Sequence, residues 1–356
     1  MKKFIVALCA LAMIAGAVSC KKDDPVDPVE DDPVVTEKLA EGIYQPAMKI
    51  ASITTDIGDF EEWSWGAKNL DHITGRGEEA HSVTFGYAGD YVSKVIGNGE
   101  EWRYFYSSNQ LSSSQLWVDN AKVIEMSFDH SADGKINSAR IDIDESYLMQ
   151  MLGGMIGGGG FPFANLLNRS AMESLAEMAK ISAAVRNNAK FSVGSLNVGI
   201  NFQWDGENVK NMMLNAGIAI NIDTNDLNLI ESLGVIPEEF STYIAMARVA
   251  MAFTGGVVPL QLEMNDTVSY TYDNNRNPFY CYLGNGIDPK AFSYNNVTIE
   301  DNHGAMTGSV SLMGQNLQLI NNPINDYMEY NYEYNAKGYP TKCESGNIVT
   351  LTYLEN

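Results

Sequence analysis

One short unit recurs along the chain and constrains the fold more than any other feature of the sequence. Its clearest copy runs from Tyr332 to Pro340, with two aromatic residues two positions apart, a polar turn containing Asn335 and Gly338, and then an outgoing strand. Alternate residues of a strand share one face, so both rings lie on the same side of a predicted hairpin. Earlier copies, with more variation, begin at Trp63, Phe85, Tyr104, Met126, Phe202 and Tyr270. Because a lone hairpin is marginally stable in water, these units must pack side by side.

Two stretches interrupt this pattern. The first, at about 147–187, contains a glycine run at 153–160 and then apolar residues at helical spacing behind a capping box. The second lies at about 226–254 and ends before two glycines. We therefore predict one α+β domain over 41–356. Its centre is a large twisted antiparallel β-sheet, a meander of hairpins, with the two helical insertions packed on one face.

The N-terminus has the three parts of a secretory signal. Met1-Lys2-Lys3 is basic, an apolar run follows, and small residues precede Cys20. This arrangement resembles the lipobox of bacterial lipoproteins, which implies a signal peptide at 1–19 and acylation, with palmitate, of Cys20. The alternative is a plain secretory signal with a chance cysteine. Lys21-Lys22-Asp23-Asp24 resembles the export signal of Bacteroidetes surface lipoproteins, which implies lipid anchoring in the outer membrane, facing the cell exterior.

Acidic residues and prolines dominate the segment that follows the signal. Residues 23–38 contain no apolar side chain larger than valine, and we predict a disordered tether at 20–40. The whole chain has a formal net charge of −22 at pH 7. Loss of the signal removes two lysines and makes this charge more negative still. Such a balance argues against nucleic acid as a partner.

The hairpin units resemble YD-type repeats, and more closely the uncharacterised Bacteroidetes surface lipoprotein domains that are built of degenerate YD-like hairpins. The resemblance covers roughly residues 42–356, and the two helical stretches depart from a pure repeat. It implies one large antiparallel sheet and a lipoprotein of the cell surface. It implies no particular activity.

Residue types suited to catalysis are sparse. His72, His81, His130 and His303 have no metal-ligand spacing, three of them fall in predicted turns or loops, and HExxH, zinc-type cysteine pairs and GxSxG are absent. The glycine run lacks the Gly-Lys-Ser or Gly-Lys-Thr ending of a phosphate-binding loop. We predict no enzyme activity, no catalytic residues, no metal and no cofactor.

Cys281 and Cys343 follow equivalent positions of two units, on strands that a simple meander holds too far apart for a disulfide. We therefore expect free thiols. A disulfide between them would instead indicate that the strand order is not sequential.

Aromatic residues are the remaining candidates for a site. Those within the repeated units are expected to pack, whereas Trp102 and Trp117 lie outside them and could form a ligand face. We predict a surface lipoprotein with a non-enzymatic binding or structural role. One alternative is a carrier or sensor of an apolar ligand held between sheet and helices, and another is an extracellular glycan-binding protein. The expected partners are the membrane, through the lipid on Cys20, and a glycan, an apolar ligand or a surface protein.

Overall fold

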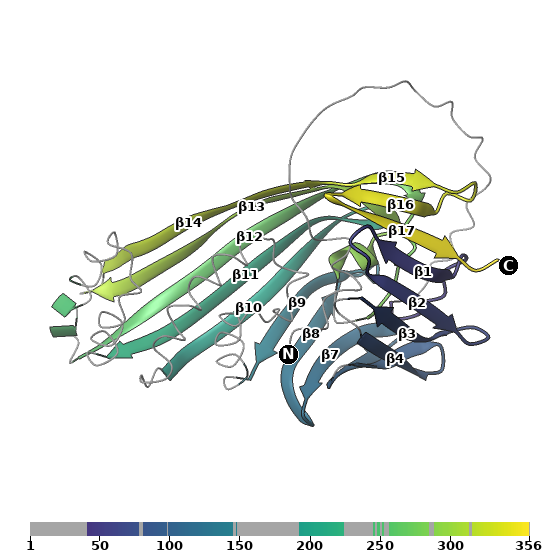
Figure 1. Ribbon diagram of the computed structural model, residues 1–356. Coiled ribbons are helices and arrows are strands. Elements are labelled where there is room, and N and C mark those ends of the chain that lie inside the picture. Colours follow the sequence, from purple (N-terminus) through teal and green to yellow (C-terminus); the bar gives the residue numbers. More distant parts are fainter. Residues whose placement is uncertain are drawn as a thin grey trace, which may run out of the picture.

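The computed structural model describes residues 41–77, 81–97, 99–144, 147, 192–223, 245, 248–249, 251–252, 256–284, 288–312 and 315–355. These residues form one 17-stranded sheet (Figure 1). The first strands are β1 (Ile50–Thr55), β2 (Phe60–Trp65), β3 (Leu70–Arg76), β4 (His81–Ala88), β5 (Tyr91–Gly97), β6 (Glu100–Ser107), β7 (Gln110–Val118), β8 (Ala121–His130) and β9 (Ile136–Ile143). The remaining strands are β10 (Ser192–Asp205), β11 (Asn208–Asp223), β12 (Val257–Arg276), β13 (Asn295–Leu312), β14 (Gln315–Glu329), β15 (Asn331–Tyr334), β16 (Pro340–Ser345) and β17 (Asn347–Tyr353).

Tight turns join most of these strands, as the repeated units predict. The clearest unit forms the β15–β16 hairpin, in which Gly338 has φ +74° and its N–H donates to the Asn335 carbonyl over 3.0 Å. A positive φ is a conformation that glycine adopts without a steric penalty. The rings of Tyr332 and Tyr334 lie on one face with their centroids 5.9 Å apart. The prediction of antiparallel hairpin units is confirmed for these strands.

The sheet closes on itself. Apart from β14 and β15, successive strands pair antiparallel, and β17 also pairs with β1, with Leu351 opposite Ile53. β14 and β15 follow one continuous path through Tyr330, whose N–H donates to the Thr298 carbonyl over 2.9 Å. β14 pairs with β13, and β15 pairs with β16. The continuous stretch from β14 to β15 therefore links the β13 side of the sheet to the β16 side. The result is a nearly closed antiparallel barrel.

The predicted α+β class is therefore wrong, because the structure is nearly all β and its sheet is barrel-like. The two helical insertions predicted at about 147–187 and 226–254 lie almost entirely outside the described residues. Closure gives the physical reason for the difference. A twisted meander with enough strands brings its first and last strands together, and their pairing satisfies the backbone groups that an open edge would expose.

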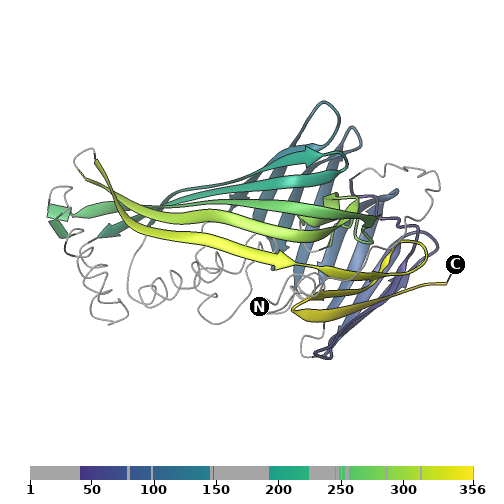
Figure 2. The same cartoon turned by 90° about the horizontal axis from the view of Figure 1, so that it is seen from above.

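Five long strands extend beyond the barrel. β10 to β14 have 14 to 20 residues, whereas β1 to β9 have 6 to 10. β10 pairs with β9 only between Val198 and Asn201. Along the rest of its length β10 pairs with β11 but with no described strand of the barrel. We call β10–β14 the blade. Figures 1 and 2 show the blade as a long, curved sheet that projects from one side of the barrel.

Between β12 and β13 the chain turns into the barrel interior. Residues 277–284 and 288–294, which we call the plug, contain a short 3-10 helix, η3 (Pro289–Phe292). Tyr282 of the plug is buried, and its ring centroid lies 5.1 Å from that of Tyr44 and 5.4 Å from that of Trp63. The interior is therefore packed with side chains.

Two local predictions are corrected here. After the aromatic pair of the unit that begins at Tyr270, Asn274, Asn275 and Pro278 predict a tight turn, but β12 continues to Arg276 and the plug follows. The polar, glycine-containing stretch at 301–308 predicts a hairpin loop, but it lies in the middle of β13. Both errors have the same cause, since Asn, Asp and Gly are turn residues by local preference but also occupy the exposed faces of long strands.

Candidate functional site: a polar cavity at the barrel rim

A cavity of about 210 Å³ lies at one end of the barrel, where several hairpin turns meet the plug. A cavity needs ~10–15 Å³ to hold one water molecule, so this cavity is much larger than a site for a single water. We call it the rim cavity. It is lined by Glu41, Asn109, Gln110, Asp133, Gly134, Lys135, Trp204, Glu207, Tyr280, Cys281 and Phe292.

Turn chemistry positions one wall of the cavity. Ser108 and Asn109 have φ +53° and +63°, the pair of left-handed conformations of a two-residue hairpin turn between β6 and β7. The β8–β9 and β10–β11 turns use Gly134 and Gly206, with φ +87° and +57°. Each turn brings polar side chains to the same rim, because alternate connections of a meander lie at one end of a barrel.

Lys135 is held in place within the wall. Its side chain is 14% exposed, and its Nζ lies 3.9 Å from the Asp133 carboxylate and 3.8 Å from the Glu207 carboxylate. The ammonium also donates to the Gly206 carbonyl and lies 5.5 Å from the ring centroid of Trp204. Because these acceptors surround it, Lys135 acts as a fixed positive charge between two carboxylates.

A second charged contact ties the start of the described chain to the cavity. The Glu41 carboxylate lies 2.9 Å from Nε2 of His130, and the same oxygen accepts the Leu111 N–H over 3.4 Å. Both side chains are largely buried, at 17% and 10% exposure. The segment that enters the barrel at Glu41 is thereby fixed to β7 and β8.

The amides of the wall retain hydrogen-bonding capacity. Among the described residues, no hydrogen bond is made by the side chains of Asn109 or Gln110. An amide offers both donors and acceptors, and a carboxylate offers acceptors. With the rings of Trp204, Tyr280 and Phe292 in the same wall, the cavity combines polar groups and aromatic surface.

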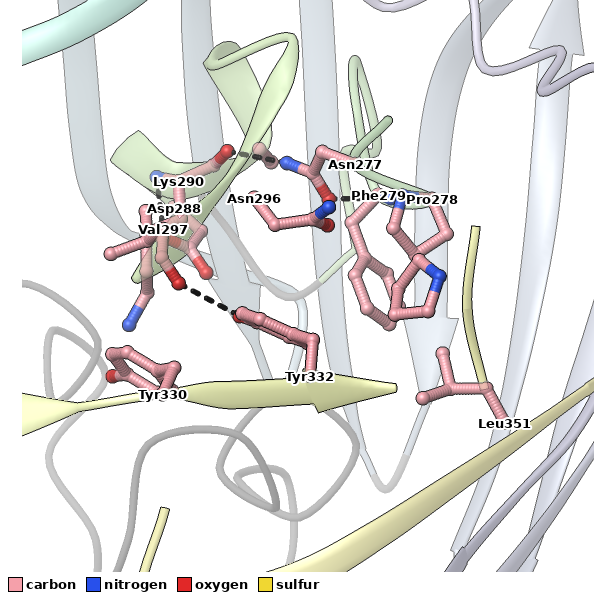
Figure 3. A pocket seen from close by; sticks show the side chains of 12 residues that line it. Asn277, Pro278, Phe279, Asp288, Lys290, Asn296, Val297, Tyr330, Tyr332 and Leu351 are labelled. Carbon is pink, nitrogen blue, oxygen red and sulfur yellow. Dashed lines mark hydrogen bonds between the residues drawn. The ribbon is translucent and has the colours of Figure 1, made fainter. Parts of the chain in front are cut away.

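The interior offers less room. A second cavity, of about 50 Å³, lies between the plug and the strands around Tyr330 and Leu351 (Figure 3). Lys290 of the plug places its Nζ 3.2 Å from the Glu300 carboxylate of β13, and the Tyr330 hydroxyl donates to the same carboxylate over 3.1 Å. The contact fixes the plug to the barrel wall, and the remaining space holds a few water molecules at most.

The structure separates the two tryptophans proposed as a ligand face. Trp102 is only 2% exposed and belongs to the core. Trp117 is half-buried on the opposite face of the sheet, with the Arg103 guanidinium carbon 4.0 Å from its ring centroid and its indole N–H donating to Gln115. They do not form a common surface. Cys20 lies outside the described residues.

Sequence reasoning missed the pairing of the histidines. All four lie in strands, not in turns or loops, and three of them meet carboxylates, in the pairs His81–Glu61, His130–Glu41 and His303–Asp301. His130 and Glu41 are 89 positions apart, so no local spacing could have indicated their contact. Within the described part of the chain, no group of three or more His, Cys, Asp and Glu residues is arranged to hold a metal ion.

The remaining candidate nucleophiles are protected. Cys281 and Cys343 are buried and form no disulfide, and burial raises the pKa of each thiol to about 12. A neutral, inaccessible thiol is unsuited to nucleophilic chemistry near neutral pH.

A search against protein-family models finds no match to this chain, and a search of curated proteins finds none either. In the part that the structure describes, no α-helix has the length and apolar character needed to cross a membrane.

Proposed function

We propose that this chain is an exported, non-enzymatic binding protein of the outer membrane surface, anchored by a lipid on Cys20. We further propose that it holds a small hydroxylated ligand, such as the terminal sugar of a glycan, in the rim cavity. The observation that carries the proposal is the cavity of about 210 Å³ in which carboxylates and amides share a wall with aromatic rings.

The chemistry of hydroxyl groups favours this ligand class. A hydroxyl donates one hydrogen bond and accepts others, so amides such as those of Asn109 and Gln110 pair with it in both directions. The Glu207 carboxylate would accept from it. Aromatic rings suit the apolar faces of a sugar ring, and small-molecule sites in general combine apolar walls with a few polar groups.

The other candidates have less support in the described residues. A carrier of an apolar ligand needs an apolar cavity, and the one predicted between the sheet and the helical stretches falls on residues outside those described, whereas the cavity beside the plug has only about 50 Å³. An enzyme needs a reactive group. The lysine of the rim cavity is surrounded by acceptors, and the cysteine beside it is a neutral thiol.

The rim cavity is tested by titrating the mature chain, lacking residues 1–20, with neutral mono- and disaccharides. Trp204 lines the cavity, so its fluorescence should change on binding. Gln110→Ala is expected to weaken that binding about tenfold, because it removes one amide that pairs with a ligand hydroxyl. Saturation-transfer NMR provides an independent measure of the same affinity.

Gln115→Ala is the matched control, since Gln115 lies on the same strand, β7, but bonds to Glu125 and Trp117 outside the cavity. Its affinity should equal that of the unaltered chain. Equal losses in both variants, or no response to any neutral sugar, would contradict the proposal.

The lipid anchor is tested separately in the producing cells. With Cys20 present, the protein should incorporate an alkyne-labelled palmitate and sediment with the outer membrane. Cys20→Ala should abolish both, because one or more acyl chains supply the membrane affinity. A Cys20→Ala protein that still sediments with membranes would rule out this anchor.

A further inference from the structure

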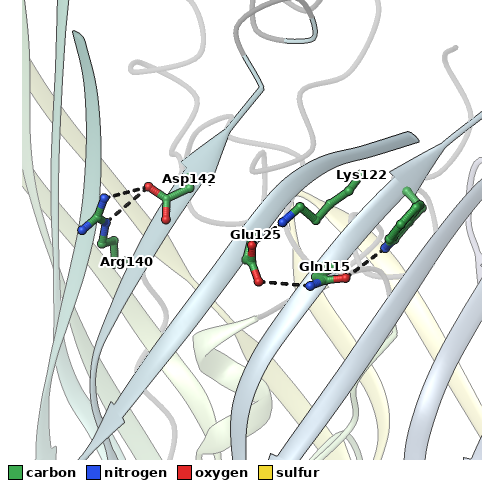
Figure 4. A network of polar contacts seen from close by, with 6 residues as sticks. Gln115, Lys122, Glu125, Arg140 and Asp142 are labelled. Carbon is green, nitrogen blue, oxygen red and sulfur yellow. Dashed lines mark hydrogen bonds and ion pairs between the residues drawn. The ribbon is translucent and has the colours of Figure 1, made fainter. Parts of the chain in front are cut away.

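The outer faces of barrel and blade differ in chemistry. On the barrel, charged side chains form short ladders, such as Lys122 with Glu125 at 2.5 Å and Arg140 with Asp142 at 3.0 Å (Figure 4). Arg76 and Glu62 make a similar pair on β3 and β2. This is the usual charged surface of a water-soluble sheet.

The outer face of the blade is arranged in rows that cross all five strands. Strand register places each of the following sets side by side, from β10 to β14: Gln203, Asn211, Ser269, Asp301 and Tyr327; Asn201, Met213, Thr267, His303 and Asn325; Gly199, Asn215, Asn265, Ala305 and Pro323; Asn197, Gly217, Glu263, Thr307 and Asn321.

Amides and hydroxyls dominate these rows. Only Glu263 and Asp301 carry a carboxylate, Asp301 is paired with His303 at 3.0 Å, and no lysine or arginine occurs. In a chain of net charge −22, such a surface is a local exception. Charged side chains are sparse in these four rows, although the chain as a whole carries a large excess of acid.

The face is also accessible and low in relief. Gly199, Gly217 and Ala305 leave shallow positions between the amides, whereas the Tyr327 ring is 56% exposed. Two contacts bridge neighbouring strands, from Asn211 to Gln203 at 2.7 Å and between His303 and Asn325 at 3.2 Å. Within the described residues, no hydrogen bond is made by the side chains of Asn201, Asn215, Asn265 or Asn321.

We propose that the outer face of the blade binds uncharged polysaccharide chains. Amide side chains both donate to and accept from sugar hydroxyls, and a flat array of them matches an extended hydroxylated polymer at several points at once. Few charges have to be desolvated, and the exposed Tyr327 ring offers a surface on which a sugar ring can stack. This site is distinct from the rim cavity and does not depend on it.

Other partners fit the face poorly. The core of a protein interface is enriched in aromatic residues, methionine and arginine, whereas here Met213 and Tyr327 stand alone among amides. Nucleic acids and anionic membranes require basic residues, which the rows lack. Pairing of this face with a second copy of the chain is the alternative that the experiment below also tests.

The experiment is affinity electrophoresis of the mature chain, lacking residues 1–20, through gels containing amylose, dextran, galactomannan or hydroxyethyl cellulose. At least one of these neutral polymers should retard the protein, and a pull-down in solution should show retention that changes little with added salt, because the binding is not ionic. The combined substitution Asn201→Asp and Asn265→Asp should reduce retention at least tenfold. It preserves shape but replaces amide donors with carboxylates.

Asn137→Asp, an exposed change of the same kind on β9 of the barrel, should leave retention unaltered, as should Gln110→Ala in the rim cavity. Circular dichroism and melting temperature establish that each variant folds. The proposal is overturned if no neutral polymer retards the protein, or if the blade substitutions leave retention intact. It is also overturned if sedimentation shows that these substitutions dissociate a dimer, which would assign the face to a second copy.

Discussion

Lys290→Met is expected to lower the free energy of unfolding by about 3 kcal/mol. Lys290 is the cationic partner of Glu300, and its removal leaves a carboxylate that is only 16% exposed without a countercharge. Removing one partner of a buried ion pair costs about 3–5 kcal/mol of stability. The side chains of Lys290 and Glu300 are 20% and 16% exposed, so we expect a loss at the lower end of this range. Urea denaturation followed by tryptophan fluorescence measures the change.

A double substitution distinguishes this cause from lost packing. Lys290→Met combined with Glu300→Gln should recover part of the loss, because it also removes the carboxylate that has lost its countercharge. Lys122→Met, at an exposed pair, should cost less than about 1 kcal/mol. A double variant that is no more stable than Lys290→Met would contradict the electrostatic explanation.

Gly75→Ala is expected to destabilise the barrel by about 2–4 kcal/mol. Gly75 on β3 lies between Glu61 on β2 and His81 on β4, and an added Cβ would lie 2.1 Å from the His81 ring. The absent side chain is what allows His81 to cross β3 and place Nε2 3.2 Å from the Glu61 carboxylate. The substitution combines overpacking with the separation of two buried polar groups.

Gly217→Ala on β11 is the matched control, because nothing lies within 4 Å of its added Cβ. Its unfolding free energy should change by less than about 1 kcal/mol. Combining Gly75→Ala with His81→Ala should relieve the clash and recover part of the overpacking cost. If Gly75→Ala and Gly217→Ala unfold at the same urea concentration, the steric explanation is wrong.

Local features of the fold could be predicted from the sequence where a short pattern dictates a local structure. Paired aromatics, a turn rich in Asn and Gly, and an alternating strand predict each hairpin, and the β15–β16 hairpin follows this pattern with its Asn335–Gly338 turn. Closure could not be predicted. The pairing of Ile53 with Leu351 depends on the accumulated twist and stagger of all the intervening strands, which no window of sequence contains.

The candidate site was harder to predict for a related reason. The rim cavity is made from turns that are far apart in sequence, and each turn residue is unremarkable by itself. Trp102 is a large aromatic residue outside the repeated units, so its type alone indicates a possible ligand contact. The alternation of β6 instead places its side chain in the core, beside Val95 and Leu116. A residue type indicates which chemistry is available, whereas the fold determines whether it faces a ligand.

The contact between β1 and β17 has a consequence for the time course of folding. Ser52 and Thr352 are 300 positions apart, and their hydroxyls lie 2.7 Å from each other. Joining such distant positions directly would cost about 5 kcal/mol in chain entropy, so the hairpins must assemble one after another and shorten the gap before the ends meet. The last strand to be synthesised completes the ring. A chain that lacks β17 therefore keeps β1 unpaired on that side, and the ring stays open until β17 has been made.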